Sequence, residues 1–561
     1  MRVLGLSCYY HDAAAALVED GKIVFAVQEE RLSRNKHDSG FPVRAVARAM
    51  EYGRCHIQDI DAIAFYEQPE VKLKRLWQQT LLDWPHSWGL FSEEIPRFFH
   101  HKLPIEAQIR QHLDYKGRVV LNEHHASHAA SAFFTSPFER ALVVTMDGVG
   151  EFETLTVYLG EGNRLTKIKS VHFPDSLGLL YSVITAYLGF EVNEGEYKVM
   201  GLAPYGQPRM LDKILGPVLQ LLPDGSFTLN QKFFRFSDKA CHFTPALVRH
   251  LGLPPRRKDD AMTQDWQDLA ASMQKALEEA LAHIIAPLIK QYGLRDFCFA
   301  GGVALNCTAN ADLIRRFNIR SYIHPAAGDA GGALGAALAV AMREKEKAPV
   351  YRYPFTPYLG TESSPALIEF TLKQSQVPFR KSANVAEELA AKLEQGQVVS
   401  IVHRREEWGP RALGARSILA DPRKAEMKDH LNAKIKFREE FRPFAPVVMA
   451  EHYGEYFEEL GMKDAPFMLY THKVKKPEAI PAVTHADATA RVQTVSREQN
   501  AYYYDILAAF YKRTGVPVLI NTSFNLKGEP MVSSPSDALK TFFASGIDCL
   551  AMEDYIVEKG N

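Results

Sequence analysis

The sequence predicts an α/β protein with two domains, the first of which contains two copies of a three-stranded β-meander. The chain has 561 residues, more than one hydrophobic core usually supports. Three strand-like runs at the start of the chain are matched by three further runs about 140 residues later. A charged, proline-rich stretch at 343–365 has the composition of a linker, so we place the domains at 1–350 and 351–561.

The two meanders are defined by alternating apolar runs and polar turns. The predicted strands of the first copy are 3–7, 13–18 and 23–27, and those of the second are 141–145, 154–159 and 165–171. Helical segments follow each copy. This arrangement resembles the actin-like, or ribonuclease H-like, superfamily, in which a nucleotide or phosphate lies between two related subdomains.

The second domain is also predicted to be α/β. Asn384 can cap a helix over 385–394, since a side-chain oxygen at that position accepts a backbone N–H of the first turn. Apolar runs at 398–402 and 518–520 indicate strands.

Composition limits the function classes. Apolar residues make up 46% of the chain and charged residues 24%, with a net charge of −1, so no bulk attraction to nucleic acid or anionic membrane is expected. The six cysteines are scattered, which is typical of a reducing compartment, and we expect a cytoplasmic protein. No apolar run reaches the ~18 residues of a membrane span, and the start does not resemble an export signal.

A histidine-rich segment at 122–133 is the first candidate site. On a helix, His124 and His128 project from one face within reach of one divalent transition metal. A zinc protease needs Glu directly after the first histidine, but His125 occupies that position. Asp147 ends an apolar strand and Asp329 lies in a glycine-rich turn, both typical places for a metal-binding or phosphate-binding carboxylate. The alternatives are a surface histidine cluster and two helix caps.

Anion sites are predicted in both domains. The glycine-rich segments at 301–306 and 328–335 suit strand-to-helix turns whose N–H groups face an anion. The segment 409–417 imitates a P-loop but lacks its Lys-Ser/Thr ending, so Walker-type binding is rejected. Basic residues near prolines and aromatics indicate a phosphate pocket, with a solvated charged face as the alternative. They are Arg411, Arg416, Lys436, Arg442 and Arg491.

Ordered motifs along nearly the whole chain resemble one family, the O-carbamoyltransferases of the nodulation, cephamycin and aminoglycoside-tailoring type. In the first half they are His11-Asp12, Glu29-Glu30-Arg31 with Arg34 and Lys36-His37, the segment 124–129, 198–206 and 301–306. In the second half they are 409–417, 436–446, 484–487 with Arg491 and Gln493, and 521–525. The family implies an actin-like transfer domain joined to a YrdC-like domain that forms an acyl adenylate.

The resemblance also implies roles for individual residues. The metal ligands are His124, His128, Asp147 and Asp329, with Fe²⁺ as the expected ion, although two imidazoles and two carboxylates also suit manganese or zinc. Asp12 is the general base for the acceptor hydroxyl, with His11 as its companion. Lys436 and Arg442 act in adenylate formation, and the substrate-binding residues are Arg411, Lys436, Arg442, Arg491, Asn521 and Ser523. Nucleotide binding is assigned to Lys198, Gly301, Gly302 and Asn306.

The resemblance implies ATP with Mg²⁺, carbamoyl phosphate and a hydroxyl-bearing acceptor, such as a sugar or natural product, as partners. It allows a homodimer, and neither nucleic acid nor membrane is expected. Two rival functions stay open: tRNA modification of the threonylcarbamoyl-adenosine type, which the missing basic stripe disfavours, and a non-catalytic actin-like nucleotide-binding scaffold. The aromatic-rich segment 66–115 is predicted to line part of the acceptor pocket, or else to be a plain helical core.

Overall fold

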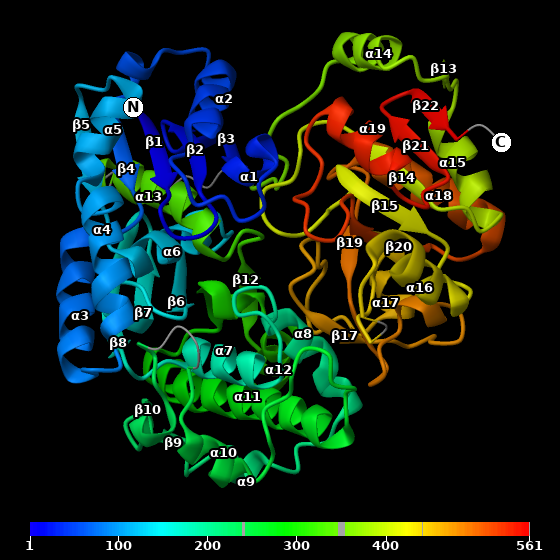
Figure 1. Ribbon diagram of the computed structural model, residues 1–561. Coiled ribbons are helices and arrows are strands. Elements are labelled where there is room, and N and C mark those ends of the chain that lie inside the picture. Colours follow the sequence, from blue (N-terminus) through cyan, green and yellow to red (C-terminus); the bar gives the residue numbers. More distant parts are fainter. Residues whose placement is uncertain (238–241, 346–353, 440, 560–561) are drawn as a thin grey trace. The chain divides into compact units, whose positions relative to one another are not determined.

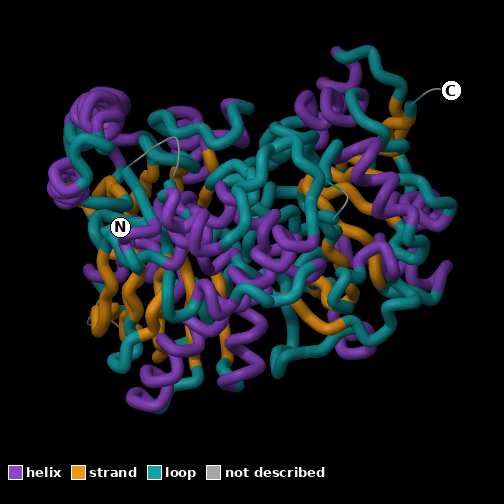
Figure 2. The backbone as a smooth tube through the Cα atoms, turned by 60° about the horizontal axis from the view of Figure 1, so that its bottom comes forward, coloured by secondary structure: helices purple, strands orange, loops and turns teal. Residues whose placement is uncertain are grey.

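The computed structural model describes residues 1–237, 242–345, 354–439 and 441–559. The chain forms two compact units, with helices and strands in both (Figure 2). Unit 1 comprises Met1–Val24 and Ser39–Pro354, and unit 2 comprises Phe25–Asp38 and Phe355–Asn561. The domain boundary expected at 350/351 falls outside the described residues.

Unit 1 contains two five-stranded sheets with the same topology (Figure 1). The first has the order β3-β2-β1-β4-β5, and its strands are β1 (Arg2–Ser7), β2 (Ala14–Glu19), β3 (Lys22–Gln28), β4 (Ala62–Phe65) and β5 (Arg118–Leu121). The second has the order β8-β7-β6-β11-β12, and its strands are β6 (Arg140–Met146), β7 (Glu153–Glu161), β8 (Arg164–His172), β11 (Asp296–Ala300) and β12 (Arg320–Ile323).

Strand directions also correspond in the two sheets. The central strands β1 and β6 each pair antiparallel with the next strand of the meander and parallel with a later strand. The outer pairs, β4 with β5 and β11 with β12, are parallel in both. The predicted duplicated actin-like domain is therefore confirmed, and the six meander strands lie within a few residues of their predicted positions.

The helix that follows the last strand of the first sheet packs closely against the helix that follows the last strand of the second. These are α6 (His124–Phe133) after β5 and α13 (Asp329–Glu344) after β12. Their approach depends on glycine, because a Cβ at Gly335 of α13 would lie 1.8 Å from the carbonyl oxygen of Ser127 in α6. Gly5 of β1 allows a similar approach to α13. The two copies of the fold therefore meet through small residues.

Helical segments extend each sheet. The segment between β4 and β5 contains α3 (Pro69–Leu82), the π-helix η2 (Leu90–Glu94), α4 (Ile95–His101) and α5 (Ile105–Leu113). In the second copy, α11 (Gln264–Tyr292) packs against α7 (Leu177–Tyr187), α8 (Glu196–Leu202) and α12 (Cys307–Phe317). No helix of the described ranges has the length and apolar character needed to cross a membrane.

Unit 2 is a second α/β unit, as predicted, built on an eight-stranded sheet of order β13-β22-β21-β14-β15-β20-β16-β19. The strands are β13 (Phe379–Lys381), β14 (Val399–Val402), β15 (Arg416–Ala420), β16 (Ala445–Met449), β19 (Gln493–Val495), β20 (Val518–Ser523), β21 (Cys549–Met552) and β22 (Tyr555–Glu558). Alternate residues of a strand face opposite sides: Val399 and Ile401 belong to one apolar core, and Val402 to the other.

Helices cover both faces of this sheet. One core includes α15 (Val385–Glu394) and α18 (Ala501–Thr514), and the other includes α14 (Pro365–Gln374) and α19 (Pro535–Phe543). The predicted cap is confirmed, since the Asn384 side chain accepts the N–H of Glu387 at the start of α15. Such two-sided coverage explains the apolar runs of the central strands.

A short N-terminal segment, Phe25–Asp38, belongs to unit 2. Its helix α1 (Glu29–Ser33) carries Arg31, which is buried and donates to the carbonyl oxygen of Gly409 at 2.8 Å. Arg34 donates to the carbonyl oxygens of Pro530 and Met531 at 2.9 and 2.5 Å. Through its hydrogen bond to Gly409, Arg31 stabilises the 409–417 loop of unit 2.

Candidate functional site

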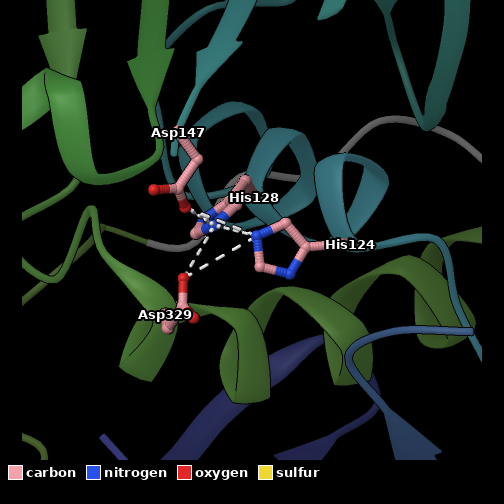
Figure 3. A group of neighbouring side chains, drawn as sticks. All are labelled: His124, His128, Asp147 and Asp329. Carbon is pink, nitrogen blue, oxygen red and sulfur yellow. Dashed lines mark hydrogen bonds and ion pairs between the residues drawn. The ribbon is translucent and has the colours of Figure 1, made fainter. Parts of the chain in front are cut away.

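Four side chains from three places in unit 1 converge on one point (Figure 3). His124 and His128 lie one turn apart on α6, Asp147 directly follows β6, and Asp329 is the first residue of α13. The structure thus brings together all four residues that the family resemblance assigned to the metal site.

The separations between donor atoms are suited to one shared cation. The His124 and His128 Nε2 atoms are 3.1 Å apart, and they lie 3.4 and 3.2 Å from Asp147 Oδ2. Asp329 Oδ1 lies 3.7 and 3.4 Å from the same two nitrogens. Ligands held ~2.1 Å from one ion at tetrahedral or octahedral angles lie about 3–3.4 Å apart, so this donor set fits a divalent transition metal.

Burial and charge shape the protonation of this cluster. Burial would lower the pKa of His128, but hydrogen bonds and charges from Asp147 and Asp329 outweigh it and raise the pKa to about 9. Burial would raise the pKa of Asp147, but the two imidazoles hold it well below its usual range. Asp147 is thus an anion, as a ligand must be.

Two neighbours that sequence reasoning missed support the histidine helix. Both carboxylate oxygens of the buried Glu151 accept the N–H of His124, at 3.0 and 3.2 Å, and one also accepts the N–H of Gln68 at 2.7 Å. Glu151 therefore accepts a backbone N–H at the start of α6 that no carbonyl oxygen within the helix can accept. His125 bonds through one ring nitrogen to Thr145 Oγ1 and through the other to the Glu153 carbonyl oxygen, so both nitrogens are occupied within the protein.

The predicted acceptor-side pair lies in the turn after β1. His11 Nδ1 is 3.6 Å from Asp12 Oδ2, and the ring of Tyr10 contacts that of His11 with centroids 4.3 Å apart. Burial would lower the pKa of His11, but the charges of Asp329 and Asp12 raise it to about 9. Asp329 is thus close enough to couple this turn electrostatically to the candidate metal ligands.

The residues assigned to nucleotide binding are placed less uniformly. Gly302 lies beside the four candidate metal ligands, because a Cβ there would be 3.0 Å from Asp147 Oδ1. Gly301 has φ of 88° and donates its N–H to the Ala327 carbonyl oxygen. Asn306 caps α12 and exchanges amide hydrogen bonds with Gln274. Lys198 lies over the ring of Phe190, with 5.5 Å from Nζ to the centroid.

In unit 2, Lys436 and Ser523 are in direct contact. The buried Lys436 Nζ donates to the carbonyl and hydroxyl oxygens of Ser523 at 2.5 and 3.2 Å. It also donates to the backbone carbonyl oxygen and the side-chain Oδ1 of Asn525 at 3.0 and 2.9 Å. Burial, together with the charges of Arg438 and Arg442, lowers the pKa of Lys436 well below its usual range. Two polar residues thus contact this amino group, and two arginines act on it through their charge.

Asn521 acts on the backbone of the 409–417 loop. Its Nδ2 donates to the Ala412 carbonyl oxygen at 3.0 Å and to Gln493 Oε1 at 2.7 Å, and Gln493 donates in turn to the Leu413 carbonyl oxygen. The buried Glu407, which sequence reasoning missed, accepts the N–H groups of Leu413, Ala415 and Arg416 through one oxygen.

Three further residues predicted to bind phosphate differ in their placement. Arg411 lies in the same loop, and Arg491 ends β18 (Thr489–Arg491), which pairs with β17 (Thr471–Lys473). Arg416, by contrast, is fully buried and donates to the backbone carbonyl oxygens of His403 and Arg404. Arg416 therefore holds the loop in place.

Comparison with known proteins assigns the family. The model of the carbamoyltransferase N-terminus matches residues 2–338, and that of the carbamoyltransferase C-terminus matches residues 390–559. The uncharacterized protein sll1178 of Synechocystis is 41% identical over 99% of this chain and 96% of its own length. The nodulation protein NolNO of Sinorhizobium fredii is 38% identical over 98% of this chain and 79% of its own.

Among solved structures, (R)-2-hydroxyglutaryl-CoA dehydratase component A of Acidaminococcus fermentans matches 62% of this chain and 99% of its own, with 15% identity and a TM-score of 0.34. The actin-like assignment accordingly rests on the duplicated sheet topology of unit 1. The fold and the two family domains define a two-domain transferase. The chain belongs to the carbamoyltransferase family.

Proposed function

We propose that this chain is an ATP-dependent O-carbamoyltransferase that uses one site in each unit. In unit 2, carbamoyl phosphate is hydrolysed to carbamate and phosphate, and the carbamate oxygen attacks the α-phosphorus of Mg²⁺-bound ATP. Pyrophosphate leaves, and carbamoyl-adenylate is formed. In unit 1, an acceptor hydroxyl attacks the carbamoyl carbon, the bond from that carbon to the phosphate oxygen breaks, and AMP leaves.

The observation that supports this scheme most directly is the convergence of His124, His128, Asp147 and Asp329 (Figure 3). These four residues would hold Fe²⁺ or another divalent metal, which when bound supplies Lewis-acid stabilisation of the charge that develops during transfer. Asp12 takes the proton of the acceptor hydroxyl, and His11 holds that carboxylate in place. The acceptor is a hydroxyl of a sugar or a natural product.

Basic groups of unit 2 carry out adenylate formation in this scheme. Lys436 and Arg442 neutralise phosphate charge, Lys436 by exchanging its contacts with Ser523 and Asn525 for phosphate oxygens. Arg411 and Arg491 bind the remaining phosphate oxygens, and Asn521 keeps the 409–417 loop in shape. Because carbamoyl nitrogen donates into its carbonyl, activation as a mixed anhydride is required before transfer.

The test separates the two half-reactions. Lys436→Ala and Arg491→Ala should stop pyrophosphate release from ATP and carbamoyl phosphate, yet still transfer the carbamoyl group from supplied carbamoyl-adenylate. His124→Ala and Asp329→Ala should release pyrophosphate normally, transfer nothing and bind less metal. Lys434→Ala and His86→Ala, at exposed positions of the same units, serve as controls. Loss of pyrophosphate release in folded metal-site variants would refute the two-site scheme.

A further inference from the structure

Helix α3 of unit 1 buries three long polar side chains and exposes three large apolar ones. The residues buried along this helix include Lys72, Arg75 and Gln79, spaced three and four apart. Trp77, Leu81 and Leu82 are exposed on the same helix. Leu76 of the same helix packs into a small apolar cluster beside them. Lys and Arg side chains are rarely buried unless they are paired, so the burial of Lys72 and Arg75 points to a ligand for these cations.

The buried cations share very little negative charge. The ammonium groups of Lys72 and of Lys102, at the end of α4, both pair with the fully buried Glu67, at 3.0 and 2.6 Å. Arg75 donates to Gln79 at 3.2 Å and lies over the ring of Phe173. In the described part of the chain, no ion pair joins Arg75 to a carboxylate, and its buried Nε has no hydrogen-bond acceptor.

The balance of charge in this cluster is positive. Among the other carboxylates that act on these cations, Glu151 is already occupied by the N–H groups of Gln68 and His124, and Asp147 and Asp329 belong to the candidate metal site. Burial lowers the pKa of Lys72 and of Lys102 to about 8 and that of Arg75 to about 10, which reports how poorly solvated these cations are. Buried charges are stable when they are paired, so one further anion would complete the cluster.

The cluster lies one aromatic ring away from the candidate metal site. The ring of Tyr10, which contacts that of His11, has Lys72 Nζ and Lys102 Nζ 5.0 and 5.5 Å from its centroid. Lys102 Nζ is also 3.5 Å from the hydroxyl of Tyr66, whose ring contacts that of His124. An anion held by the cluster would therefore lie beside the reacting groups.

We propose that Lys72, Arg75 and Lys102 form an anion site that binds the phosphate group of the acyl-adenylate donor and of the AMP that leaves. This inference rests on the proposed function. The adenylate phosphate carries one negative charge, and it gains a second as the carbon–oxygen bond breaks while the acceptor proton passes to Asp12. The three cations, set against Glu67 and Glu151, leave one excess positive charge, which is complementary to the bound donor and more so to the departing AMP.

Titration calorimetry with AMP on the metal-loaded full chain tests this site, in a Lys436→Ala background that removes phosphate binding in unit 2. Arg75→Gln and Lys102→Met should each weaken AMP binding at least tenfold and leave adenosine binding unchanged. Arg75→Lys, which keeps the charge, should lose less affinity. Lys74→Met, at an exposed position of α3, should match the unmodified background.

Unchanged AMP affinity in Arg75→Gln and Lys102→Met, or equal losses for adenosine and AMP, would overturn the anion site. If Arg75→Gln fails to fold, Arg75→Lys and Lys102→Met still decide the question. The proposed function has its own readout, because unmodified protein that releases no pyrophosphate from ATP and carbamoyl phosphate would refute it irrespective of the AMP result.

Discussion

Acid should destabilise unit 1 through His324, which follows β12 in the turn that leads to Asp329. This side chain is fully buried, and its Nδ1 accepts the N–H of Ala326 at 3.1 Å. Burial lowers the pKa of His324 to about 3, against ~6.5 in the unfolded chain. As pH falls below 6.5, the unfolded chain takes up a proton that the folded protein excludes, so stability is lost with falling pH.

The size of this effect follows from the two pKa values. Between pH 7 and pH 5 the proton bound only in the unfolded chain reduces the free energy of unfolding by about 2 kcal/mol, at ~1.36 kcal/mol for each pH unit below 6.5. His324→Asn keeps an acceptor for the Ala326 N–H but cannot be protonated. The variant should be less stable at pH 7, because it leaves a cavity, yet should lose about 2 kcal/mol less than unmodified protein on acidification.

Urea unfolding at pH 7 and pH 5, followed by tryptophan fluorescence, measures the difference. Four of the five tryptophans, at 77, 84, 88 and 266, lie in unit 1. His86→Asn changes an exposed histidine of the same unit and should keep the full acid sensitivity. If His324→Asn lost as much stability between the two pH values as unmodified protein, the reasoning from burial would be wrong.

Three further predictions concern the supporting residues. Glu151→Gln should destabilise the start of α6 by ~0.5–2 kcal/mol and weaken metal binding, without affecting pyrophosphate release; metal titration with unchanged affinity would contradict this. Glu407→Gln should weaken three charge-assisted bonds in the 409–417 loop by ~1–3 kcal/mol in total and reduce pyrophosphate release, as measured by thermal unfolding and a coupled assay. Replacing the exposed Trp84 and Trp88 by Ser should alter acceptor preference across a panel of hydroxyl compounds, and an unchanged preference would remove the predicted role of segment 66–115.

The parts that the sequence predicted are those encoded by local pattern. The meander strands alternate over short runs and end in polar turns, so both copies could be placed within a few residues. The cap at Asn384 is likewise a local signal. The convergence of His124 with Asp147 and Asp329 was expected from the family resemblance, because the spacing of two histidines on a helix does not identify carboxylates far away in the chain.

The features that the sequence did not reveal depend on contacts between distant segments. Glu151 was missed because the N–H groups that it accepts belong to residues 27 and 83 positions away. The membership of Phe25–Asp38 in unit 2 was missed because Arg31 reaches a backbone oxygen 378 positions away. The segment 66–115 was predicted either to line the acceptor pocket or to form a helical core, and its aromatic side chains divide: Trp77, Trp84 and Trp88 are exposed, whereas Phe98 is buried.

The duplicated topology explains why the candidate ligands meet. His124 and Asp329 are the first residues of α6 and α13, and each helix directly follows the last strand of its own copy of the fold. Asp147 follows the central strand of the second copy, and in the first copy the corresponding turn carries His11 and Asp12. The candidate site residues therefore lie at matching positions of the two copies, and the spacing of the four candidate ligands depends on how closely α6 packs on α13.

Gly335→Ala tests that dependence. Its Cβ would lie 1.8 Å from the Ser127 carbonyl oxygen, a contact that α13 can relieve only by moving away from α6. Such a shift carries Asp329 away from His124 and His128, which lie 3.7 and 3.4 Å from it, while each sheet retains its own pairing. Metal affinity and carbamoyl transfer should fall together, whereas pyrophosphate release in unit 2 should persist. Gly89→Ala, at a glycine of unit 1 with open space around it and a helical φ of −64°, controls for the change in residue type and should leave metal affinity unchanged. Equal metal affinity in Gly335→Ala and unmodified protein would show that the ligands do not depend on the contact between the two helices.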